Sequence, residues 1–494
     1  MFKHASDEFL DILLGFYNDN VLSGHTPDNW RETLFSMLPK TGDMTNVQNW
    51  RPIAILRISY KLFARLLYHR LRPILESQQS PDQVGFRRKK FSEDAFLVFE
   101  AMCNKSLEWG CELWCMSCDL SKAFDRLEFS ALFEALRDQG VSEGYLRILA
   151  GIYSKQTGRL KKSRAFSIER GVKQGDVLSP LLFNAGLELA LRRFKARVQG
   201  CGVAIDSGER LTNMRYADDL MVYANSSAEL CTMMEALTDE LAKVGLHFNS
   251  AKTKAFTTQA LPQRMFLEVA GEFVAVLRPE ETHKYLGRSL PGNLRKRNEV
   301  EFSHRLQIAW MRFRKHADVL LDKHVHIRQR LKFFQAVITP TVLYGLSAAA
   351  LSAQQLEKLN ATQRRMFRNM VGWTRVDAED WSDTIRRMRR KVEAALQSFP
   401  VADWSAQFLR NQFRFACRVA VRFSDLPFRV CQWQPGLSVA GAQRSRGRPQ
   451  LRWDNRLSCF ALSKFDSSNW LDAFSNPSIL AHADAYVSFH CRVA

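Results

Sequence analysis

Tyr216-Ala217-Asp218-Asp219 is the stretch of sequence that decides the fold of this chain. An apolar run, Leu220-Met221-Val222-Tyr223, follows the two acids. This pattern predicts a strand–turn–strand hairpin with the two carboxylates at its tip. Adjacent carboxylates repel each other unless a cation neutralises them, and paired oxygen ligands suit Mg²⁺, which keeps coordination positions for substrate phosphates. Most Asp-Asp pairs are solvated turn residues, so the meaning of this pair depends on a third acid.

A third aspartate stands in matching surroundings. The mostly apolar run Leu113-Trp114-Cys115-Met116-Ser117-Cys118 ends in Asp119, and a helix-like segment follows it. A strand that passes into a helix places its last acid at the mouth of a sheet, where ligands bind in α/β arrangements. Asp119, Asp218 and Asp219 are therefore suited to hold two divalent ions. Two such ions stabilise the attacking and leaving oxygens of an in-line phosphoryl displacement.

Further motifs stand in a fixed order around these acids. They are Asn49-Trp50-Arg51-Pro52-Ile53-Ala54-Ile55-Leu56, Gln83-Val84-Gly85-Phe86-Arg87, Gly171-Val172-Lys173-Gln174-Gly175, Lys284-Tyr285-Leu286-Gly287, Leu343-Tyr344-Gly345 and Arg446-Gly447-Arg448-Pro449. In this order the motifs resemble those of a non-LTR retrotransposon reverse transcriptase of the long interspersed element type. The likeness is firm over residues 30–375 and looser beyond them.

The resemblance implies a right-hand polymerase of the α+β fold class, with fingers and palm built from antiparallel sheet plus helices. A helical thumb and a small, mostly helical C-terminal region are expected after them. The expected division is an N-terminal helical extension at 1–30, fingers and palm at 31–290, thumb at 291–375 and a basic region of unknown role at 376–494. The turn residues Pro291-Gly292-Asn293 mark the start of the thumb.

The resemblance also implies roles for residues at matching positions. Asp119, Asp218 and Asp219 are the expected ligands of two Mg²⁺ ions, with Mn²⁺ as an alternative metal. Phe124 matches the bulky residue that excludes a ribose 2′-hydroxyl. The other expected positions are Lys40 and Arg51 as cations that hold the triphosphate, Gln174 and Gly175 as the floor of the nucleotide pocket, and Lys252 as the proton donor to pyrophosphate.

Local sequence patterns add further structural expectations. Hydrophobic spacing predicts helices over residues 1–30, 53–75 and 91–106. Residues 333–353 carry no charge and are nearly long enough to span a bilayer, but they contain polar residues and basic helices flank them. We expect a buried helix broken at Pro340 and no membrane association.

The charge of the chain indicates a polyanionic partner. The 494 residues have a formal net charge of +20, and residues 291–494 hold 33 Lys and Arg against 16 Asp and Glu. A near-neutral catalytic half followed by a basic half fits a polymerase core with a thumb that grips an RNA template and a DNA primer. A generally basic, solvated surface is the alternative. Deoxynucleoside triphosphates are the expected substrates, and the oligomeric state stays open.

The cysteines and the termini bear on the compartment. Ten Cys are scattered without zinc-ligand spacing or a disulfide framework, which favours a reducing environment. The first residues lack the apolar core of a signal peptide. We expect an intracellular, nuclear protein.

Two departures from the family pattern bear on activity. Asp176 stands where Cys is common in the family, and Arg215 stands where an apolar residue is more usual, but neither removes a metal ligand. The expected function is RNA-directed DNA polymerisation, in which a primer is extended by two-metal-ion nucleotidyl transfer. A catalytically decayed RNA-binding protein on the same scaffold is the alternative, and the intact acids, Gln174 and Phe124 argue against it. A third interpretation is an RNA-templated RNA polymerase or an intron maturase: Phe124 as a bulky gate disfavours ribonucleotides, and no intron-specific feature is visible in the sequence.

Overall fold

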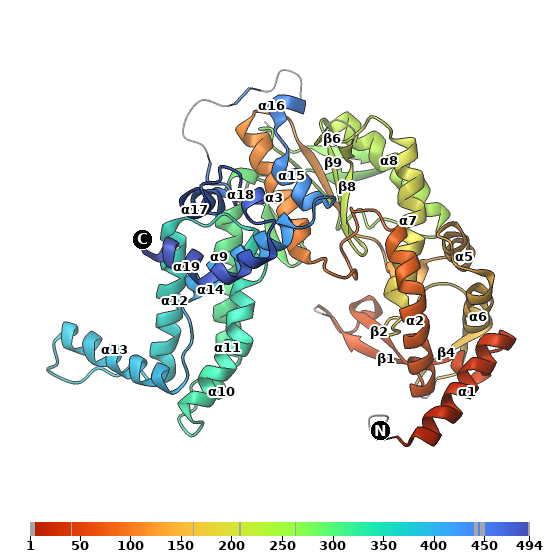
Figure 1. Cartoon of the computed structure of the whole chain (residues 1–494), viewed down its shortest axis with the longest axis horizontal. Coiled ribbons are helices and arrows are strands. Elements are labelled where there is room, and N and C mark those ends of the chain that lie inside the picture. Colours follow the sequence, from red (N-terminus) through yellow and green to blue (C-terminus); the bar gives the residue numbers. More distant parts are fainter. Residues whose placement is uncertain are drawn as a thin grey trace.

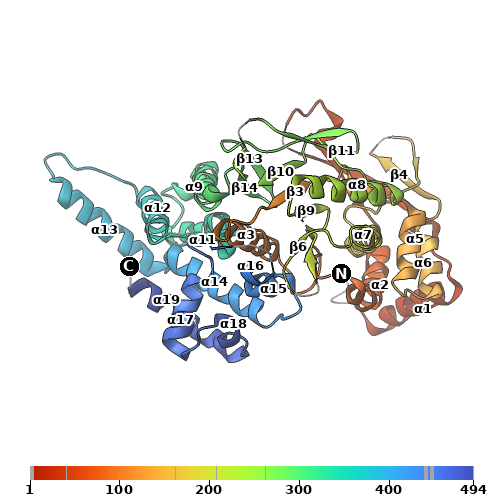
Figure 2. The same cartoon turned by 90° about the horizontal axis from the view of Figure 1, so that it is seen from above.

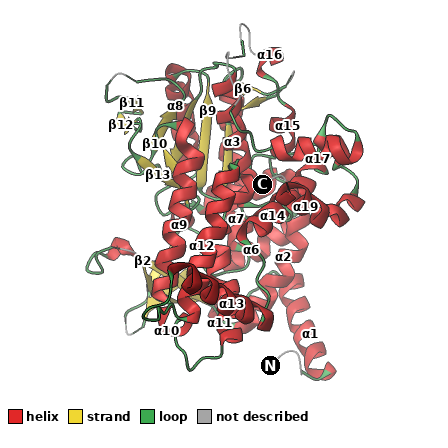
Figure 3. Ribbon diagram, turned by 90° about the vertical axis from the view of Figure 1, so that its left-hand side faces the viewer, coloured by secondary structure: helices red, strands yellow, loops and turns green. Residues whose placement is uncertain are grey.

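The computed structural model describes residues 5–40, 42–161, 163–206, 209–261, 263–438, 443–444 and 450–492. Figure 1 shows an open shape in which the N-terminal helices and a small sheet stand opposite a group of long helices from the second half of the chain. A second sheet joins these two sides (Figure 1). Helices make up most of the fold, and the strands gather in small sheets (Figure 3).

The N-terminal sheet, named the fingers sheet, has the strand order β2-β1-β4-β5. Strand β1 pairs antiparallel with β2 and parallel with β4. The helix predicted over 53–75 is wrong at its start, because residues 53–55 belong to β2 and the following helix begins only at Ile58. The elements of this side are α1 (Asp7–Ser23), β1 (Glu32–Pro39), β2 (Trp50–Ile55), α2 (Ile58–Gln78), α5 (Phe129–Asp138), α6 (Glu143–Tyr153), β4 (Gln156–Leu160) and β5 (Phe166–Ile168).

The second sheet, named the palm sheet, is antiparallel throughout, with the order β10-β3-β9-β8. Helix α3 confirms the helix predicted over 91–106. The elements of this part are α3 (Ser92–Glu108), β3 (Trp114–Cys118), α4 (Ala123–Arg126), α7 (Ser179–Arg197), β8 (Asn213–Tyr216), β9 (Asp219–Ala224), α8 (Ser227–Lys243) and β10 (Lys254–Thr257).

The palm sheet is buried on both faces. Cys115 and Tyr223 pack into one core with residues of α3, whereas Met116 and Val222 pack into another with residues of α7 and α8. Side chains alternate between the faces of a strand, so these neighbours point to opposite cores. This explains why β3 and β9 are nearly continuous apolar runs and why the acids at their ends are conspicuous.

The long helices opposite the fingers sheet, named the thumb helices, follow a hairpin of two short strands. Helix α11 runs through Pro340 without a break and ends at Leu343, so the predicted break at Pro340 is wrong. Gly345, in a left-handed conformation with φ 69°, then turns the chain. The elements are β13 (Thr282–Tyr285), β14 (Arg288–Pro291), α9 (Arg297–Lys315), α10 (Ala317–Leu320), α11 (Ile327–Leu343), α12 (Ala353–Val371) and α13 (Trp381–Ser398).

The C-terminal helices share one apolar core with α3 and the thumb helices. This core extends from Phe96 in α3 through Phe334 in α11 to Trp404 and Tyr486. Figure 2 shows α3 lying among the thumb helices and the C-terminal helices. The C-terminal elements are α14 (Trp404–Ala420), α15 (Leu426–Gln432), α16 (Pro435–Ser438), α17 (Asn455–Phe465), α18 (Trp470–Ala473) and α19 (Ala483–Arg492).

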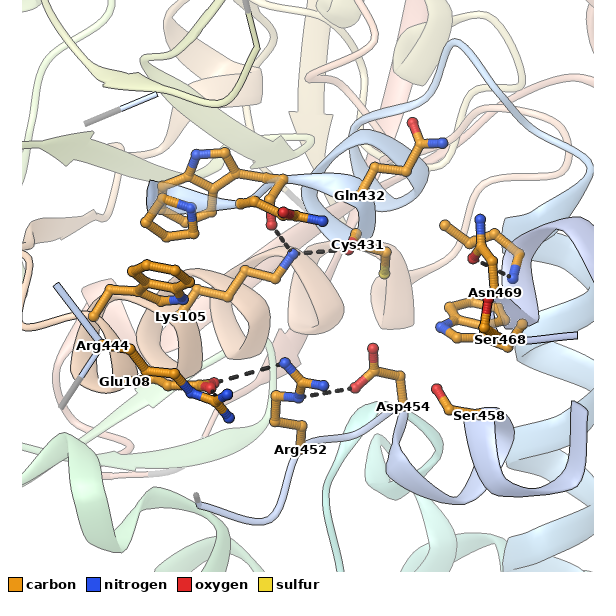
Figure 4. A pocket seen from close by; sticks show the side chains of 16 residues that line it. Lys105, Glu108, Cys431, Gln432, Arg444, Arg452, Asp454, Ser458, Ser468 and Asn469 are labelled. Atoms are coloured by element: carbon orange, nitrogen blue, oxygen red, sulfur yellow. Dashed lines mark hydrogen bonds and ion pairs between the residues drawn. The ribbon is translucent and has the colours of Figure 1, made fainter. Parts of the chain in front are cut away.

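Two partly buried cations tie the C-terminal helices to α3. Arg422 forms an ion pair of 2.5 Å with Asp94, at the first turn of α3. At the other end of α3, the Lys105 ammonium donates hydrogen bonds of 2.7 Å to the carbonyls of Val430 and Cys431, and it also donates to the carbonyl of Trp433. Figure 4 shows Lys105 beside Cys431. Burial lowers the pKa of Lys105 to about 8. These bonds occupy C-terminal carbonyls of α15, so Lys105 acts as a structural anchor.

The remaining elements are short. Helices within the described ranges lack the length and apolar character needed to cross a membrane. All ten cysteines lie in the described residues and are free thiols. The motif at 446–449 lies outside the described residues. The short elements are η2 (Asp28–Trp30), η3 (Val47–Asn49), β6 (Val203–Ala204), β7 (Arg210–Leu211), β11 (Phe266–Val269), β12 (Glu272–Ala275), η4 (Leu294–Lys296), η5 (Leu346–Ala348) and η6 (Pro477–His482).

Candidate active site

The predicted acid hairpin is present at the end of the palm sheet. Strands β8 and β9 pair with Tyr216 opposite Asp219, so Ala217 and Asp218 form the turn. On the other side of β9, Cys118 pairs with Leu220, and Asp119 follows Cys118 directly. The backbone carbonyl of Asp119 is held by the amide of Asn249 at 2.8 Å. The sheet register therefore brings Asp119 next to the hairpin that carries the other two acids.

The three carboxylates act on one another electrostatically. Burial raises the pKa of Asp219 to about 7, and the charges of Asp218 and Asp119 add to this shift. Burial also raises the pKa of Asp218, with the charge of Asp119 as a further cause, while the positive charge of Arg51 acts in the opposite direction. Clustered, partly desolvated carboxylates are stabilised as anions by added cations. The site therefore has the charge and the oxygen donors that suit divalent metal ions.

A metal ion bound here would need further oxygen ligands in addition to the protein side chains. Within the described part of the chain, no three His, Cys, Asp or Glu side chains lie in an arrangement that could hold an ion by themselves. Mg²⁺ in phosphoryl-transfer sites uses one or two carboxylates together with waters and substrate phosphates. The three aspartates fit that role, because they supply carboxylates in one place and leave the other positions to substrate.

Lys252 lies at the same cluster. Its Nζ is 3.4 Å from Oδ2 of Asp119, and its side chain is 67% exposed. It comes from the segment before β10, which pairs with β3, so the palm sheet also fixes its position. The ammonium of Lys252 is therefore both close to Asp119 and open to solvent.

Phe124 and Gln174 are joined to each other through Asp125. The Phe124 ring stacks on Phe183, with ring centroids 4.5 Å apart and planes at 13°. The Gln174 side-chain amide donates to both carboxylate oxygens of Asp125 at 3.2 Å. Asp125 directly follows Phe124, so this contact joins the ring to the turn that carries Gln174. Burial raises the pKa of Asp125, and the charge of Lys40 is among the smaller causes that oppose the shift.

Gly175 forms the joint between the palm and the fingers sheet. Its φ is +107°, and a Cβ built on it would lie 3.0 Å from the carbonyl oxygen of Ala54 in β2. The amide of Ala54 donates to the carbonyl of Gln174 at 2.7 Å. Arg51 precedes Ala54 on the same strand and is exposed. The turn at Gln174 and Gly175 therefore helps to position the strand that carries Arg51. At Gly175 the backbone of the turn lies close to the backbone of β2.

The two departures from the family pattern are accommodated inside the protein. Arg215 is 1% exposed, and its guanidinium pairs with Glu188 of α7 at 2.6 Å. Asp176 accepts a hydrogen bond of 2.5 Å from the hydroxyl of Tyr60. Strand β8 is thus buried despite its arginine, because an ion pair compensates the charge.

Sequence reasoning missed two residues that contact the acid hairpin. The Phe86 ring lies 6.2 Å from that of Phe124 and 6.4 Å from that of Tyr216, measured between centroids. Gln83 hydrogen-bonds to the backbone of Ala217. Both residues stand in the motif at 83–87, and the only signal was their place in that motif, because the contacts arise between segments far apart in sequence.

The chain is similar to known proteins over most of its length. Residues 38–290 match the reverse transcriptase (RNA-dependent DNA polymerase) family. The chain is 28% identical over 352 residues to the retrovirus-related Pol polyprotein from type-1 retrotransposable element R2 of Popillia japonica, which covers 69% of this chain and 48% of the relative. It is 25% identical over 384 residues to the retrovirus-related Pol polyprotein from type-2 retrotransposable element R2DM of Drosophila melanogaster. This match covers 75% of this chain and 34% of the relative.

The chain thus spans about half, or less, of the length of these curated relatives. Among solved structures, it is 13% identical to telomerase from Candida tropicalis in complex with the TWJ fragment of telomeric RNA, with a TM-score of 0.41 over 87% of this chain and 68% of that chain. The family match covers more than half of the residues and contains the three aspartates of the palm sheet. This chain belongs to the reverse transcriptase family and is of the non-LTR retrotransposon type.

Proposed function

We propose that this protein is an RNA-directed DNA polymerase that extends a DNA primer on an RNA template. The observation that carries the proposal is the convergence of Asp119, Asp218 and Asp219 at one end of the palm sheet, where the charge of Asp119 helps to raise the pKa values of Asp218 and Asp219. In the reaction a primer 3′-hydroxyl attacks the α-phosphate of a deoxynucleoside triphosphate, and pyrophosphate leaves. Phosphoryl transfer of this kind needs positioning and charge stabilisation more than covalent chemistry from the protein.

The side chains of the site divide this work. Asp119, Asp218 and Asp219 would hold two Mg²⁺ ions, which when bound supply charge stabilisation to the attacking and leaving oxygens. Lys252 would give a proton to pyrophosphate from its place beside Asp119. The triphosphate would be held by Lys40, which directly follows β1, and by Arg51 of β2, and the nucleotide would rest on the turn of Gln174 and Gly175.

Primer extension on poly-rA with an oligo-dT primer tests the proposed function. We expect incorporation of dTTP that depends on Mg²⁺, that stops when EDTA removes the metal and that resumes when excess Mg²⁺ is added. Mn²⁺ is expected to replace Mg²⁺ in part, because it accepts the same oxygen ligands. Tight RNA binding without any incorporation would instead support an RNA-binding protein that has lost its chemistry.

Replacing Phe124 by alanine is expected to relax the choice of sugar. The ring is fixed by stacking on Phe183, so it presents a rigid wall to a ribose 2′-hydroxyl. Removing that wall should reduce the preference for dTTP over rUTP by about 10- to 100-fold, the range that a single steric contact gives. Single-nucleotide incorporation with each substrate measures the ratio.

A matched control for this prediction is Phe273→Ala. Phe273 is 68% exposed and lies in β12, which belongs to a separate two-stranded sheet and not to the palm sheet that carries the acids. It should leave the ratio unchanged. Equal use of dTTP and rUTP by the wild-type protein would contradict the assigned role of Phe124.

The partners and the domain division follow from the same proposal. The template–primer duplex would lie between the fingers sheet and the thumb helices, whose exposed cations include Arg312 and Arg364. Binding through phosphates should weaken as salt rises, because counterions are released. We further propose the domain limits 31–290 for fingers and palm and 291–375 for the thumb, and a nuclear location.

A further inference from the structure

A short segment of the chain is laid along the outer edge of the acid hairpin. The amide of Val84 donates to the carbonyl of Arg215, and the amide of Arg215 donates to the carbonyl of Asp82, each at 2.9 Å. Gln83 and Arg215 form a parallel bridge at this edge. Residues 82–84 therefore act as a partial fifth strand beside β8, although they come from the segment before α3.

The residue that precedes the acids adopts an unfavourable backbone conformation. Ala217 has φ 57°, in the left-handed region, where a Cβ atom crowds the following carbonyl. Such a conformation persists in a residue other than glycine only when its surroundings hold it. Ala217 is also 2% exposed, so its amide and carbonyl need partners within the protein.

The side chain of Gln83 supplies both partners. Its Oε1 accepts from the amide of Ala217 at 2.9 Å, and its Nε2 donates to the carbonyl of Ala217 at 3.4 Å. The same Oε1 accepts from the amide of Gly85 at 2.8 Å. Only one orientation of the amide satisfies two N–H donors and one carbonyl acceptor, so the group is fixed. Gln83 is 1% exposed, which excludes competition from water.

The clamp formed by Gln83 is held tightly against the turn. A Cβ built on Gly85 would lie 2.2 Å from the amide nitrogen of Ala217 and 2.8 Å from the carbonyl carbon of Tyr216. Only glycine allows the two backbones to approach this closely. The carbonyl of Gly85 is in turn held by the side chain of Asn184, which donates at 2.9 Å from α7. The segment therefore has no freedom to move away from the hairpin.

We propose that Gln83 is a positioning residue for the catalytic carboxylates. It holds Ala217 in the left-handed conformation and thereby sets the direction in which Asp218 and Asp219 leave the turn. The inference rests on the proposed polymerase function, because it assigns Gln83 a role in the same site. The side-chain hydrogen bonds of Gln83 go to the backbone of Ala217 and Gly85, so it acts on the acids through the backbone of the turn.

The test replaces Gln83 by methionine, which has similar length and no hydrogen bonds to offer. We expect kcat for dTTP incorporation to fall by about 10- to 100-fold, the range that misplacement of catalytic groups gives. The KM for dTTP and the Kd for template–primer should change less than about three-fold, because the groups that hold phosphates and duplex stay in place. An unchanged kcat would overturn the inference.

Two further variants separate positioning from stability. Gln412 of α14 is buried, donates to the carbonyl of Trp453 at 3.1 Å and accepts from the hydroxyl of Tyr486 at 2.9 Å, and both partners belong to the C-terminal part of the chain. Gln412→Met should lower the melting temperature and leave kcat unchanged. Ala217→Gly, placed in the Gln83→Met background, should restore at least several-fold of the lost kcat, because glycine enters the left-handed region without a clamp. No recovery would indicate that Gln83 only fills space.

Hydrogen exchange distinguishes this inference from the function on which it rests. The Ala217 amide should be protected in the wild-type protein and should exchange at least ten-fold faster in Gln83→Met, whereas peptides of α7 keep their rates. If the wild-type protein extends no primer, the proposed function fails and the catalytic role of Gln83 fails with it. If it extends primers and the Ala217 amide is unaffected by Gln83→Met, only the clamp is wrong.

Discussion

Asp218→Ala should abolish primer extension while template–primer binding stays within a few-fold of the wild-type value. The Asp218 carboxylate lies in the turn of the hairpin, next to Asp219, and the charge of Asp119 acts on it. In this place it would share in binding the metal ions. Loss of several kcal/mol of transition-state stabilisation corresponds to a decrease of about 10³-fold or more in rate. Extension assays on poly-rA and binding by fluorescence anisotropy give the two quantities.

The same substitution should not weaken the fold. Burial and a neighbouring carboxylate raise the pKa of Asp218, so at neutral pH the folded state holds its charge at a cost that the unfolded state does not have. Removing the charge removes that cost, and the melting temperature should stay equal or rise. The control is Asp239→Ala on α8, where the side chain is 58% exposed and pairs with Arg197 at the surface. Substantial extension by Asp218→Ala would refute the assignment of the site.

The largest effect on stability is expected at Glu100 of α3. Its two carboxylate oxygens accept from Arg288 of β14 at 2.8 Å and from Arg297 of α9 at 2.7 Å, and each of the three side chains is 1% exposed. Glu100→Ala leaves two buried guanidinium groups without this partner. Breaking a buried pair in this way costs about 3–5 kcal/mol. A large decrease in the urea midpoint, followed by circular dichroism, is the expected result.

A surface pair gives the control for Glu100. Glu393 of α13 pairs with Arg389 at 2.9 Å, but the two side chains are 54% and 77% exposed. Glu393→Ala should change the free energy of unfolding by about 0–1 kcal/mol. Equal effects at Glu100 and Glu393 would show that the buried network does not join α3 to the thumb helices as described.

The acids of the site could be predicted because their signal is local. Strands buried on both faces are continuous apolar runs, so Asp119 and the pair at Asp218 and Asp219 interrupt the pattern where the strands end. The pairing of Cys118 with Leu220 then brings the three acids together. Lys252 and Phe124 could be placed only through the family resemblance, because a single lysine or phenylalanine has no pattern of its own.

Contacts between distant segments escaped prediction. Gln83 and Ala217 are 134 positions apart, and no local pattern links them. The parallel pairing of β1 with β4 is of the same kind. A short apolar run such as residues 53–55 fits a strand or a buried helix equally well, and the fingers sheet decides between them.

Pro340 shows how a local rule is overridden. Proline removes a hydrogen-bond donor and crowds the preceding turn, which predicts a break. In the structure Pro340 is exposed, and α11 ends three residues later at Leu343. Water can satisfy the carbonyl left without a partner, so the helix continues through the proline.

The attachment of the last helices to α3 has a practical consequence. A shortened chain that stops after α13 would lack Arg422, which pairs with the fully buried Asp94 carboxylate, and would lose the partners of Lys105. It would also uncover the apolar side of α3, the helix that packs against the palm sheet. Recombinant fragments of this protein should therefore retain the chain through α19, and shorter ones are expected to be insoluble.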